Sequence, residues 1–205
     1  MARKTKVAAE ETREQLLDAA EKMFYQHGVS RTTLEKIAAA AGVTRGAIYW
    51  HFENKSMLFS AMLERIRLPF QQMLGELDSM QHADPLAQLR TVLIHSLERI
   101  AYCEQHQRVL SVVFHRCEYI DELNPAVSKQ EELDRAATAV ISRALQRARL
   151  AGMLQDNIDP DLTASAIHAY IGGLIRKFLL QPDFCDLTHA TAYVDVMLQG
   201  IKKPA

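Results

Sequence analysis

Side chains that can contact nucleic acid gather in one short segment, residues 44–55, of this 205-residue chain. Placing residues about 100° apart around a helix puts Ile48 and Phe52 on one face and Arg45 and Tyr49 on the opposite face. The apolar face can anchor the helix, while the other face can meet base edges and flanking basic residues can hold phosphates. The residues that fit these roles, together with the threonines before them, are Thr32, Thr33, Thr44, Arg45, Gly46, Ala47, Tyr49, Trp50, His51 and Lys55.

Two short helices joined by a glycine turn must position these side chains. Thr32 and Glu35 have the spacing of a capping box, in which each side chain satisfies a free backbone N–H group, so the first helix is predicted to begin near Thr33. Gly42 then ends this helix and Thr44 caps the second one. The segment is therefore predicted to form a helix-turn-helix, whose second helix enters the major groove of DNA.

A generic helical hairpin is the alternative interpretation, with the Tyr49–Trp50 pair stacking on another protein as in a helical adaptor. A lone exposed aromatic residue would favour that alternative, but the capping box, the glycine turn, the donor-rich face and Lys55 all agree with DNA binding. The salt dependence of binding distinguishes DNA binding from protein binding, because phosphate contacts weaken steeply with ionic strength and aromatic contacts between proteins do not.

The same residues carry a family resemblance. Residues 10 to about 65 resemble the DNA-binding domain of TetR-family repressors, and GVTRGAIYWHFENK matches that family's signature almost throughout. MARKTK at the start and FHRCE at Phe114 to Glu118 further resemble the branch that regulates multidrug efflux pumps, the AcrR and TtgR type. The resemblance implies an all-helical homodimer that binds double-stranded operator DNA and is released by a small lipophilic or aromatic inducer. Whether binding represses or activates depends on where the operator lies relative to a promoter.

Composition sets independent limits on these interpretations. With 48% hydrophobic residues and a net charge of −1, the chain is neither disordered nor collagen-like. Lys and Arg against Asp and Glu number nine and seven over residues 1–55, and fifteen and eighteen over residues 56–205, which gives +2 and −3. The sign suits a DNA-binding head on an acidic body, but so small a charge does not identify the partner.

Two further features indicate a cytoplasmic protein without a membrane segment. The longest charge-free apolar stretch, Leu162 to Ile175, is too short to span a bilayer. The three cysteines form no CxxC pair and are odd in number, which suits reduced thiols.

The helical spacing of apolar residues and the positions of prolines predict the rest of the fold. Asp84, Asn124 and Asp159 each precede a proline that can occupy the first position of a helix. A helix that starts at Met57 is predicted to be interrupted or kinked at Pro69. We therefore predict an all-α protein of about nine helices, whose first helix is built on Leu16, Ala20 and Phe24 and stops at Gly28. Residues 1–55 form a three-helix DNA-binding domain, and residues 56–205 form a ligand-binding and dimerisation domain.

The run from Ala164 to Leu180 is apolar on nearly every side, so other helices or a second subunit must cover it. Gly172 and Gly173 loosen a helix by about 1 kcal/mol each relative to alanine, which close packing or a cavity has to offset. The last helix, with Val196 on its apolar stripe, offers a compatible surface. We expect a four-helix homodimer interface from the last two helices of each subunit.

Ligand recognition requires an apolar cavity with a few polar groups. For the aliphatic candidates, plain core packing is the favoured interpretation. His168 and Arg176 are more specific, because they lie two turns apart on an apolar helix and a buried His or Arg needs a partner: a ligand, a carboxylate such as Glu118, or the other subunit. The candidates are Ile66, Arg67, Phe70, Val92, Leu93, Ser96, Leu110, Val113, Phe114, Ile141, His168, Ile171 and Arg176.

The sequence contains no G-x-S-x-G, H-E-x-x-H, phosphate-binding loop or dinucleotide motif, so we expect no catalytic residues and no cofactor. If the protein were an enzyme, it would be a small helical enzyme that uses the cavity as its active site. His115, Cys117 and Glu118 lie close in sequence, but i and i+2 positions on a helix point to different sides. We therefore expect no metal site.

Overall fold

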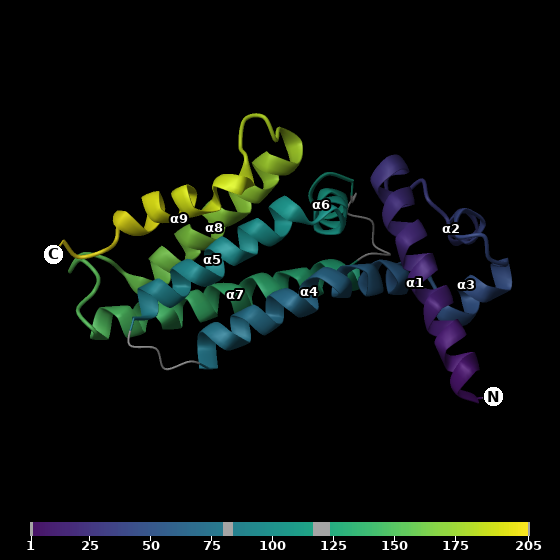
Figure 1. The fold of residues 1–205 in the computed structure, drawn as a ribbon, viewed down its shortest axis with the longest axis horizontal. Coiled ribbons are helices and arrows are strands. Elements are labelled where there is room, and N and C mark those ends of the chain that lie inside the picture. The colour runs from purple at the N-terminus through teal and green to yellow at the C-terminus, as the bar shows by residue number, and fades with distance from the viewer. Residues whose placement is uncertain (1, 80–83, 117–123, 205) are drawn as a thin grey trace. The chain divides into compact units, whose positions relative to one another are not determined.

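Figure 1 shows the computed structural model, which describes residues 2–79, 84–116 and 124–204. Across these ranges the chain forms nine α-helices, a π-helical turn and a 3-10 turn, and the strand-like pairing described is a single bridge between Leu154 and Lys202. The prediction of an all-α fold of about nine helices is confirmed. The elements are α1 (Ala2–His27), α2 (Leu34–Ala40), α3 (Arg45–His51), α4 (Lys55–Ser79), α5 (Pro85–Tyr102), α6 (Glu104–Ser111), η1 (Val112–Arg116), α7 (Asn124–Leu150), α8 (Pro160–Leu180), η3 (Leu187–His189) and α9 (Ala190–Gln199).

The chain divides into two compact units, which we describe separately. The head unit extends past the expected boundary at residue 55, because the first turns of α4 carry Leu58, Phe59 and Met62 into its core. The head unit consists of Met1–Arg67 and Arg108–Lys129, and the body unit of Leu68–Gln107 and Gln130–Ala205.

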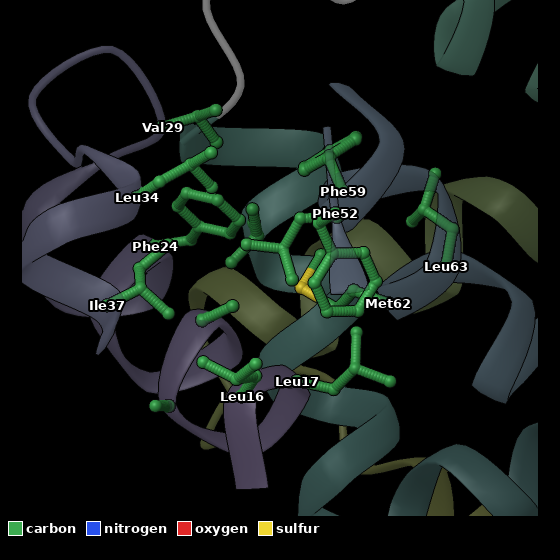
Figure 2. Packing of buried hydrophobic residues seen from close by; sticks show 14 of the residues in the cluster. Leu16, Leu17, Phe24, Val29, Leu34, Ile37, Phe52, Phe59, Met62 and Leu63 are labelled. Carbon is green, nitrogen blue, oxygen red and sulfur yellow. The ribbon is translucent and has the colours of Figure 1, made fainter. Parts of the chain in front are cut away.

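Aromatic and aliphatic side chains from α1 to α4 form the core of the head unit, as Figure 2 shows. The rings of Phe24 and Phe59 meet edge to face with their centroids 5.9 Å apart, an arrangement that aromatic pairs favour. Leu16, Ile37 and Ile48 are completely buried in the same cluster. Full burial of one such side chain contributes roughly 1.5–3 kcal/mol. This core fixes α2 and α3, which are too short to be stable as isolated helices.

Helix boundaries in the head unit follow the predicted signals with one correction. α1 ends at His27 and is followed by Gly28 in the left-handed conformation, with φ +80°. The N-cap of α2 is Thr33, whose hydroxyl accepts a hydrogen bond from the Lys36 N–H. The predicted capping role of Thr32 is wrong, because Thr32 is buried and donates to the Gly28 carbonyl at 2.8 Å. The geometry of the turn before α2 decides which of the two adjacent threonines caps the helix.

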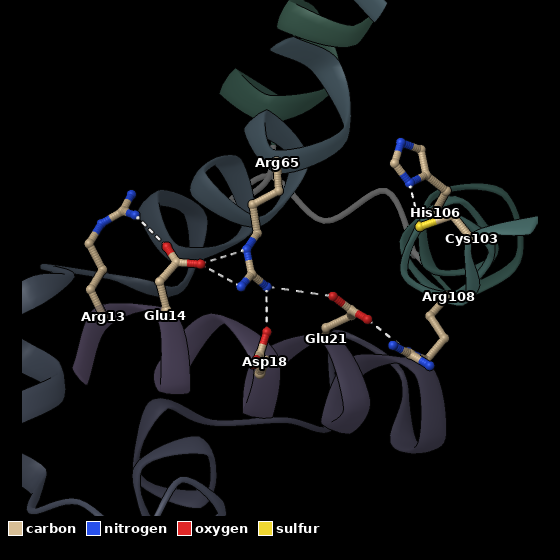
Figure 3. Close-up of polar contacts among 8 residues, drawn as sticks. All are labelled: Arg13, Glu14, Asp18, Glu21, Arg65, Cys103, His106 and Arg108. Carbon is tan, nitrogen blue, oxygen red and sulfur yellow. Dashed lines mark hydrogen bonds and ion pairs between the residues drawn. The ribbon is translucent and has the colours of Figure 1, made fainter. Parts of the chain in front are cut away.

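A network of ion pairs joins α4 and α6 to α1 within the head unit (Figure 3). Arg65 approaches Glu14 to 2.5 Å, Asp18 to 2.7 Å and Glu21 to 3.7 Å. The second oxygen of Glu21 accepts a hydrogen bond from Arg108 at 2.7 Å. Burial lowers the pKa of Arg65, but hydrogen bonds and charge from Asp18 and Glu14 more than offset that effect, so the pKa is raised. The buried Glu21 carboxylate thus faces two guanidinium groups.

Capped prolines begin two body helices as predicted. Asp84 accepts a hydrogen bond from the Ala87 N–H at 2.8 Å, and Asp159 accepts from two N–H groups at the start of α8. α7 begins at Asn124, also as predicted. α4 runs through Pro69 without a break, so the predicted interruption does not occur, and the alternative of a kink at Pro69 stays a prediction. The fixed φ of proline is itself helical, so the chain can continue as a helix through this position.

Ion pairs join neighbouring helices of the body unit. Arg90 on α5 makes two hydrogen bonds to Asp195 on α9, at 2.5 and 2.9 Å. Arg143 on α7 makes two hydrogen bonds to Asp78 on α4, at 2.7 and 2.9 Å. α9 also packs against α5, and its buried side chains are Ala190, Val194 and Leu198.

Candidate nucleic-acid interface

The two helices and the turn of the predicted motif are all present. Gly42 adopts the left-handed conformation with φ +70°, which only glycine adopts without strain, and the Val43 N–H donates to the Ala38 carbonyl at 3.0 Å. Thr44 is the N-cap of α3, and its hydroxyl accepts a hydrogen bond from the Ala47 N–H at 3.2 Å. A tight turn and a capped start therefore fix the direction of α3 relative to α2.

α3 has one anchored face and one open face, as the sequence predicts. Ile48 is completely buried and Phe52 is 3% exposed. On the other face, the Arg45 side chain is 74% exposed, Tyr49 is 43% exposed and Trp50 is 72% exposed. Trp50 therefore lies on the open face of α3 together with Arg45 and Tyr49.

The backbone of α3 is accessible at Gly46. A Cβ atom at this position would meet only the Thr44 hydroxyl, at 3.9 Å, and otherwise open space. Glycine is therefore not required here by packing within the chain. Its missing side chain leaves room for another molecule to approach the first turn of the helix.

Glu35 on α2 links two of the exposed side chains of α3, those of Arg45 and Tyr49. Its Oε1 atom accepts a hydrogen bond from the Tyr49 hydroxyl at 2.8 Å and lies 3.5 Å from Nη2 of Arg45. Hydrogen bonds from its own backbone, from Tyr49 and from Thr33 lower the pKa of Glu35. The sequence placed Glu35 only in a capping box. The one signal for this further role was its place in a helix that packs against α3.

His51 follows Trp50 at the end of α3, and their rings meet edge to face at 4.5 Å. Burial lowers the pKa of His51, and the nearby positive charge of Arg13 lowers it further. His51 is therefore neutral near pH 7 in the free protein. It can donate one hydrogen bond to a phosphate without carrying a charge.

A shallow depression of about 280 Å³ lies beside α3 and brings several predicted contact residues together. Its wall includes carboxylates as well as basic and hydroxyl groups, so the surface is not uniformly basic. Thr32 contributes to the wall, but its buried hydroxyl is engaged with Gly28, which argues against a direct DNA contact. The lining residues are Thr32, Thr33, Leu34, Glu35, Tyr49, Glu53, Asn54 and Lys55.

The predicted ligand-binding residues divide between the two units and differ in exposure. The buried ones are Ile66, Arg67, Leu93, Ser96 and Ile141; the half-buried ones are Phe70, Val92, Leu110, Val113, His168 and Ile171; and Phe114 and Arg176 are exposed. Ser96 donates to the Val92 carbonyl at 2.7 Å, so it is a satisfied core residue. Arg67 is a buried cation that lies 3.4 Å from Glu64.

The chain by itself does not bury His168 and Arg176, so their burial by a ligand or by a second subunit stays a prediction. Arg176 is exposed, and the His168 side chain is 38% exposed with Nε2 3.8 Å from Asp134. Both lie on faces of α8 that the rest of the body unit leaves open, which the uniformly apolar sequence of this helix did not reveal. The partner suggested for them, Glu118, lies outside the described residues.

A pocket of about 580 Å³ opens between α7 and α8, and His168 is the one predicted ligand residue in its wall. Most of its lining residues carry a charged or hydroxyl group, and the aliphatic residues that the sequence suggested for a ligand cavity do not line it. The Ser142 hydroxyl donates to Asp161 across it. The lining residues are Asp134, Arg135, Thr138, Ala139, Ser142, Arg143, Gln146, Asp161, Ser165 and His168.

Metal-binding clusters and membrane-spanning helices are both missing from the described ranges. In the part of the chain that the structure describes, no three His, Cys, Asp or Glu side chains converge as metal ligands would. Cys117 and Glu118, two of the three residues of the cluster considered from the sequence, lie outside the described residues. None of the described helices is both long and apolar enough to cross a membrane.

Two sequence families match separate parts of the chain. Residues 16–62 match the bacterial regulatory proteins of the tetR family, and residues 84–203 match the C-terminal region of MAATS-type transcriptional repressors. The HTH-type transcriptional regulator TtgR of Pseudomonas putida is 38% identical over 91% of this chain and 89% of its own length.

Two solved structures are similar over nearly their whole length. NalD, the secondary repressor of the MexAB-OprM multidrug efflux pump in Pseudomonas aeruginosa, superimposes with a TM-score of 0.87 at 35% identity, covering 97% of this chain and 99% of NalD. The complex of SmeT with triclosan gives a TM-score of 0.84 at 37% identity, covering 95% and 93%. SmeT represses the SmeDEF multidrug efflux pump of Stenotrophomonas maltophilia.

Proposed function

Because the chain belongs to the tetR family of bacterial regulatory proteins, we propose that it is a ligand-responsive repressor that binds operator DNA through α3. One observation carries the proposal: Ile48 and Phe52 are buried behind α3, while Arg45, Tyr49 and Trp50 are exposed on its other side. Such a surface can enter a major groove and donate hydrogen bonds to base edges. The family consists of transcriptional regulators, so the chain is a regulator and not an enzyme.

The groups on this surface divide by the part of the duplex that each can reach. Arg45 and Tyr49, near the start of α3, contact base edges, and Gly46 lets the backbone approach. Thr33, Thr44 and Lys55 lie at helix ends, where hydroxyl, backbone N–H and ammonium groups bind phosphates. Ala47, Trp50 and His51 complete the contact surface.

We propose that the active form is a homodimer that pairs α8 and α9 of each subunit. The buried residues of α8 are Ala164 and Ile167, whereas Leu162 is 74% exposed and Val196 of α9 is 71% exposed. A groove of about 320 Å³ between α8 and α9 has a mainly apolar wall that includes Gly173. A Cβ at Gly173 would meet nothing within 4 Å, so there is room for another helix to pack closely. Burial of this apolar surface would stabilise a dimer.

Two recognition helices of a dimer must match successive major grooves, which lie about 34–36 Å apart. A ligand that binds better to a dimer with mismatched spacing shifts the population toward that form and releases the DNA. The helix that leaves the DNA-binding domain, α4, is the lever in this scheme. Thermodynamic linkage then requires DNA and ligand to weaken each other's binding by the same factor.

The proposed inducer is lipophilic or aromatic, and the proposed target is a multidrug efflux system. Support comes from the relatives: NalD and SmeT are described as repressors of such pumps, and SmeT was solved with triclosan. Arg67, a buried cation, would suit an anionic or phenolic group on the ligand. A repressor acts where the chromosome is, so we place the protein in the cytoplasm.

The proposal is tested by offering the purified protein fragments of its own genome, with and without a panel of lipophilic compounds. We expect retention of fragments that share one sequence, and loss of those fragments with at least one compound. Retention of no particular sequence would overturn operator binding. A compound that binds together with the operator, without any mutual loss of affinity, would overturn the inducer mechanism alone.

A further inference from the structure

We infer that Glu35 on α2 is a positioning residue, which holds Arg45 and Tyr49 of α3 in place and so determines how strongly one DNA sequence is preferred over another. The inference rests on the proposed DNA-binding function and adds a residue that itself need not touch DNA. It also assigns α2 a part in specificity beyond supporting α3.

The three side chains form a closed triangle on the surface of the head unit. Oε1 of Glu35 accepts from the Tyr49 hydroxyl at 2.8 Å and lies 3.5 Å from the Arg45 guanidinium. The Arg45 guanidinium in turn lies 5.6 Å from the centre of the Tyr49 ring, within the range of a cation–π contact. Each of the two recognition side chains therefore has two contacts that restrict its rotamers.

The core of the head unit holds Glu35 itself in place. Leu34 and Ile37, on either side of it, are buried, and Thr33 caps the helix just before it. Hydrogen bonds from its own backbone, Tyr49 and Thr33 lower the pKa of Glu35, so the carboxylate is ionised at neutral pH. A fixed anion on a short, anchored helix is a rigid acceptor for the mobile side chains of α3.

Pre-ordering matters because tyrosine and arginine lose rotamer freedom when they bind. The cost of ordering each such side chain corresponds to about two- to tenfold in affinity. If Glu35 orders both side chains before DNA arrives, a matching sequence gains the full benefit of their contacts. A carboxylate close to DNA also repels phosphates, which weakens binding to every sequence alike. Positioning and repulsion therefore have different signatures when Glu35 is removed.

Glu53 provides a matched control for the charge. It lines the same depression as Glu35 and is exposed, but among the described residues it makes no hydrogen bond or ion pair. Glu53→Ala therefore removes one negative charge near the DNA without releasing Arg45 or Tyr49. Glu35→Ala removes the charge and the clamp together. Glu35→Gln removes the charge but keeps an amide oxygen that can accept from Tyr49.

The experiment compares affinities for two duplexes at one salt concentration: one that the unaltered protein selects from a random-sequence library, and a scrambled duplex of equal composition. We expect Glu53→Ala to strengthen both affinities equally and leave their ratio unchanged. Glu35→Ala should lower the ratio about four- to hundredfold, because two side chains lose their order. Glu35→Gln should recover a large part of that loss. Equal ratios for Glu35→Ala and Glu53→Ala would overturn the positioning role.

A second measurement needs no DNA. Nuclear magnetic resonance of the free protein should show that Glu35→Ala, but not Glu53→Ala, shifts the Tyr49 ring signals and increases the mobility of the Arg45 side chain. Unchanged signals would overturn the clamp even if the duplex ratio fell. If the unaltered protein selects no duplex, the proposed function fails and the inference fails with it, whereas an altered ratio without altered mobility overturns the inference alone.

Discussion

Tyr49 combines the two properties that a reading residue needs at the surface of α3. The residue is 43% exposed, and its hydroxyl donates a hydrogen bond to Glu35 in the free protein. The aromatic ring can pack against a thymine methyl group or a sugar while the hydroxyl stays hydrogen-bonded. Neighbouring Trp50 is more exposed but has no comparable clamp among the described residues.

Tyr49→Ala should weaken binding to the selected operator and leave dimerisation intact. Loss of one base-specific contact costs roughly 1–3 kcal/mol, or about five- to 150-fold in affinity, in a gel-shift series. Tyr25→Ala removes an exposed tyrosine from α1 and serves as the control. A Tyr49→Ala protein with full sequence preference would contradict the assigned role.

His106 and His51 make stability depend on pH. Burial lowers the pKa of each below the ordinary value of 6.5, and the charges of Arg99 and Arg13 add to the effect. The unfolded chain takes up protons near pH 6.5 and the folded chain does so only at lower pH. The free energy of unfolding therefore falls as the pH drops below about 6.5 and is independent of these groups well above it.

This dependence is measured by urea unfolding at about pH 7.5 and pH 5.5. His106, whose Nδ1 lies 3.1 Å from Sγ of Cys103, should account for part of the difference, so His106→Gln should reduce it. His95→Gln changes an exposed histidine of α5 and controls for the substitution itself. An equal pH difference in the unaltered protein and His106→Gln would show that His106 is not responsible.

At the scale of elements, local sequence signals were sufficient to predict the helix-turn-helix. They were insufficient to predict the side-chain contacts between its helices and their neighbours. Gly42, Thr44 and Ile48 could be assigned from the sequence because a turn, a cap and a helical stripe depend on neighbours within four residues. The contact of Glu35 with Tyr49 and that of Glu21 with Arg65 depend on how two helices cross, which no local spacing encodes. The choice of Thr33 over Thr32 depended on the preceding turn in the same way.

For α8, the sequence predicted burial without showing which faces of the helix pack against the rest of the chain. Its apolar length indicated burial, but a uniformly apolar stripe does not say which face the rest of the chain covers. The sequence therefore did not predict that Arg176 is exposed and His168 only half-buried. The ligand-binding residues chosen from such stripes therefore stay predictions, whereas the recognition helix was identified by its contrast between two faces.

The ion pairs that join α1, α4 and α6 should contribute to the stability of the head unit. Glu21→Gln leaves Arg65 and Arg108 without the full charge of a buried carboxylate, and we expect a loss of about 2 kcal/mol in the free energy of unfolding. Glu10→Gln changes an exposed carboxylate on the same helix, whose ion pair to Arg13 is 3.7 Å long, and should cost little. Equal losses in the two variants would mean that the buried network contributes nothing beyond a surface charge.

On the scale of the whole molecule, the proposed dimer depends on the open faces of α8 and α9. Val196→Asp places a charge on the exposed face of α9, and desolvating that charge should separate the subunits. Sedimentation should then give the mass of one chain, against two for the unaltered protein. Leu150→Asp alters another highly exposed apolar residue, outside α8 and α9, and should remain dimeric. Dissociation of both variants, or of neither, would contradict this interface.

The salt dependence of operator binding is the most direct test of the claim that the exposed face of α3 contacts duplex DNA. Each phosphate that the protein neutralises contributes about −0.9 to the slope of log affinity against log salt concentration. We predict a steep negative slope for the selected operator. Lys55→Ala should make this slope less steep by about one for each Lys55 side chain that contacts a phosphate in the complex. A flat slope, or a pure protein that prefers no duplex at moderate salt, would contradict the account.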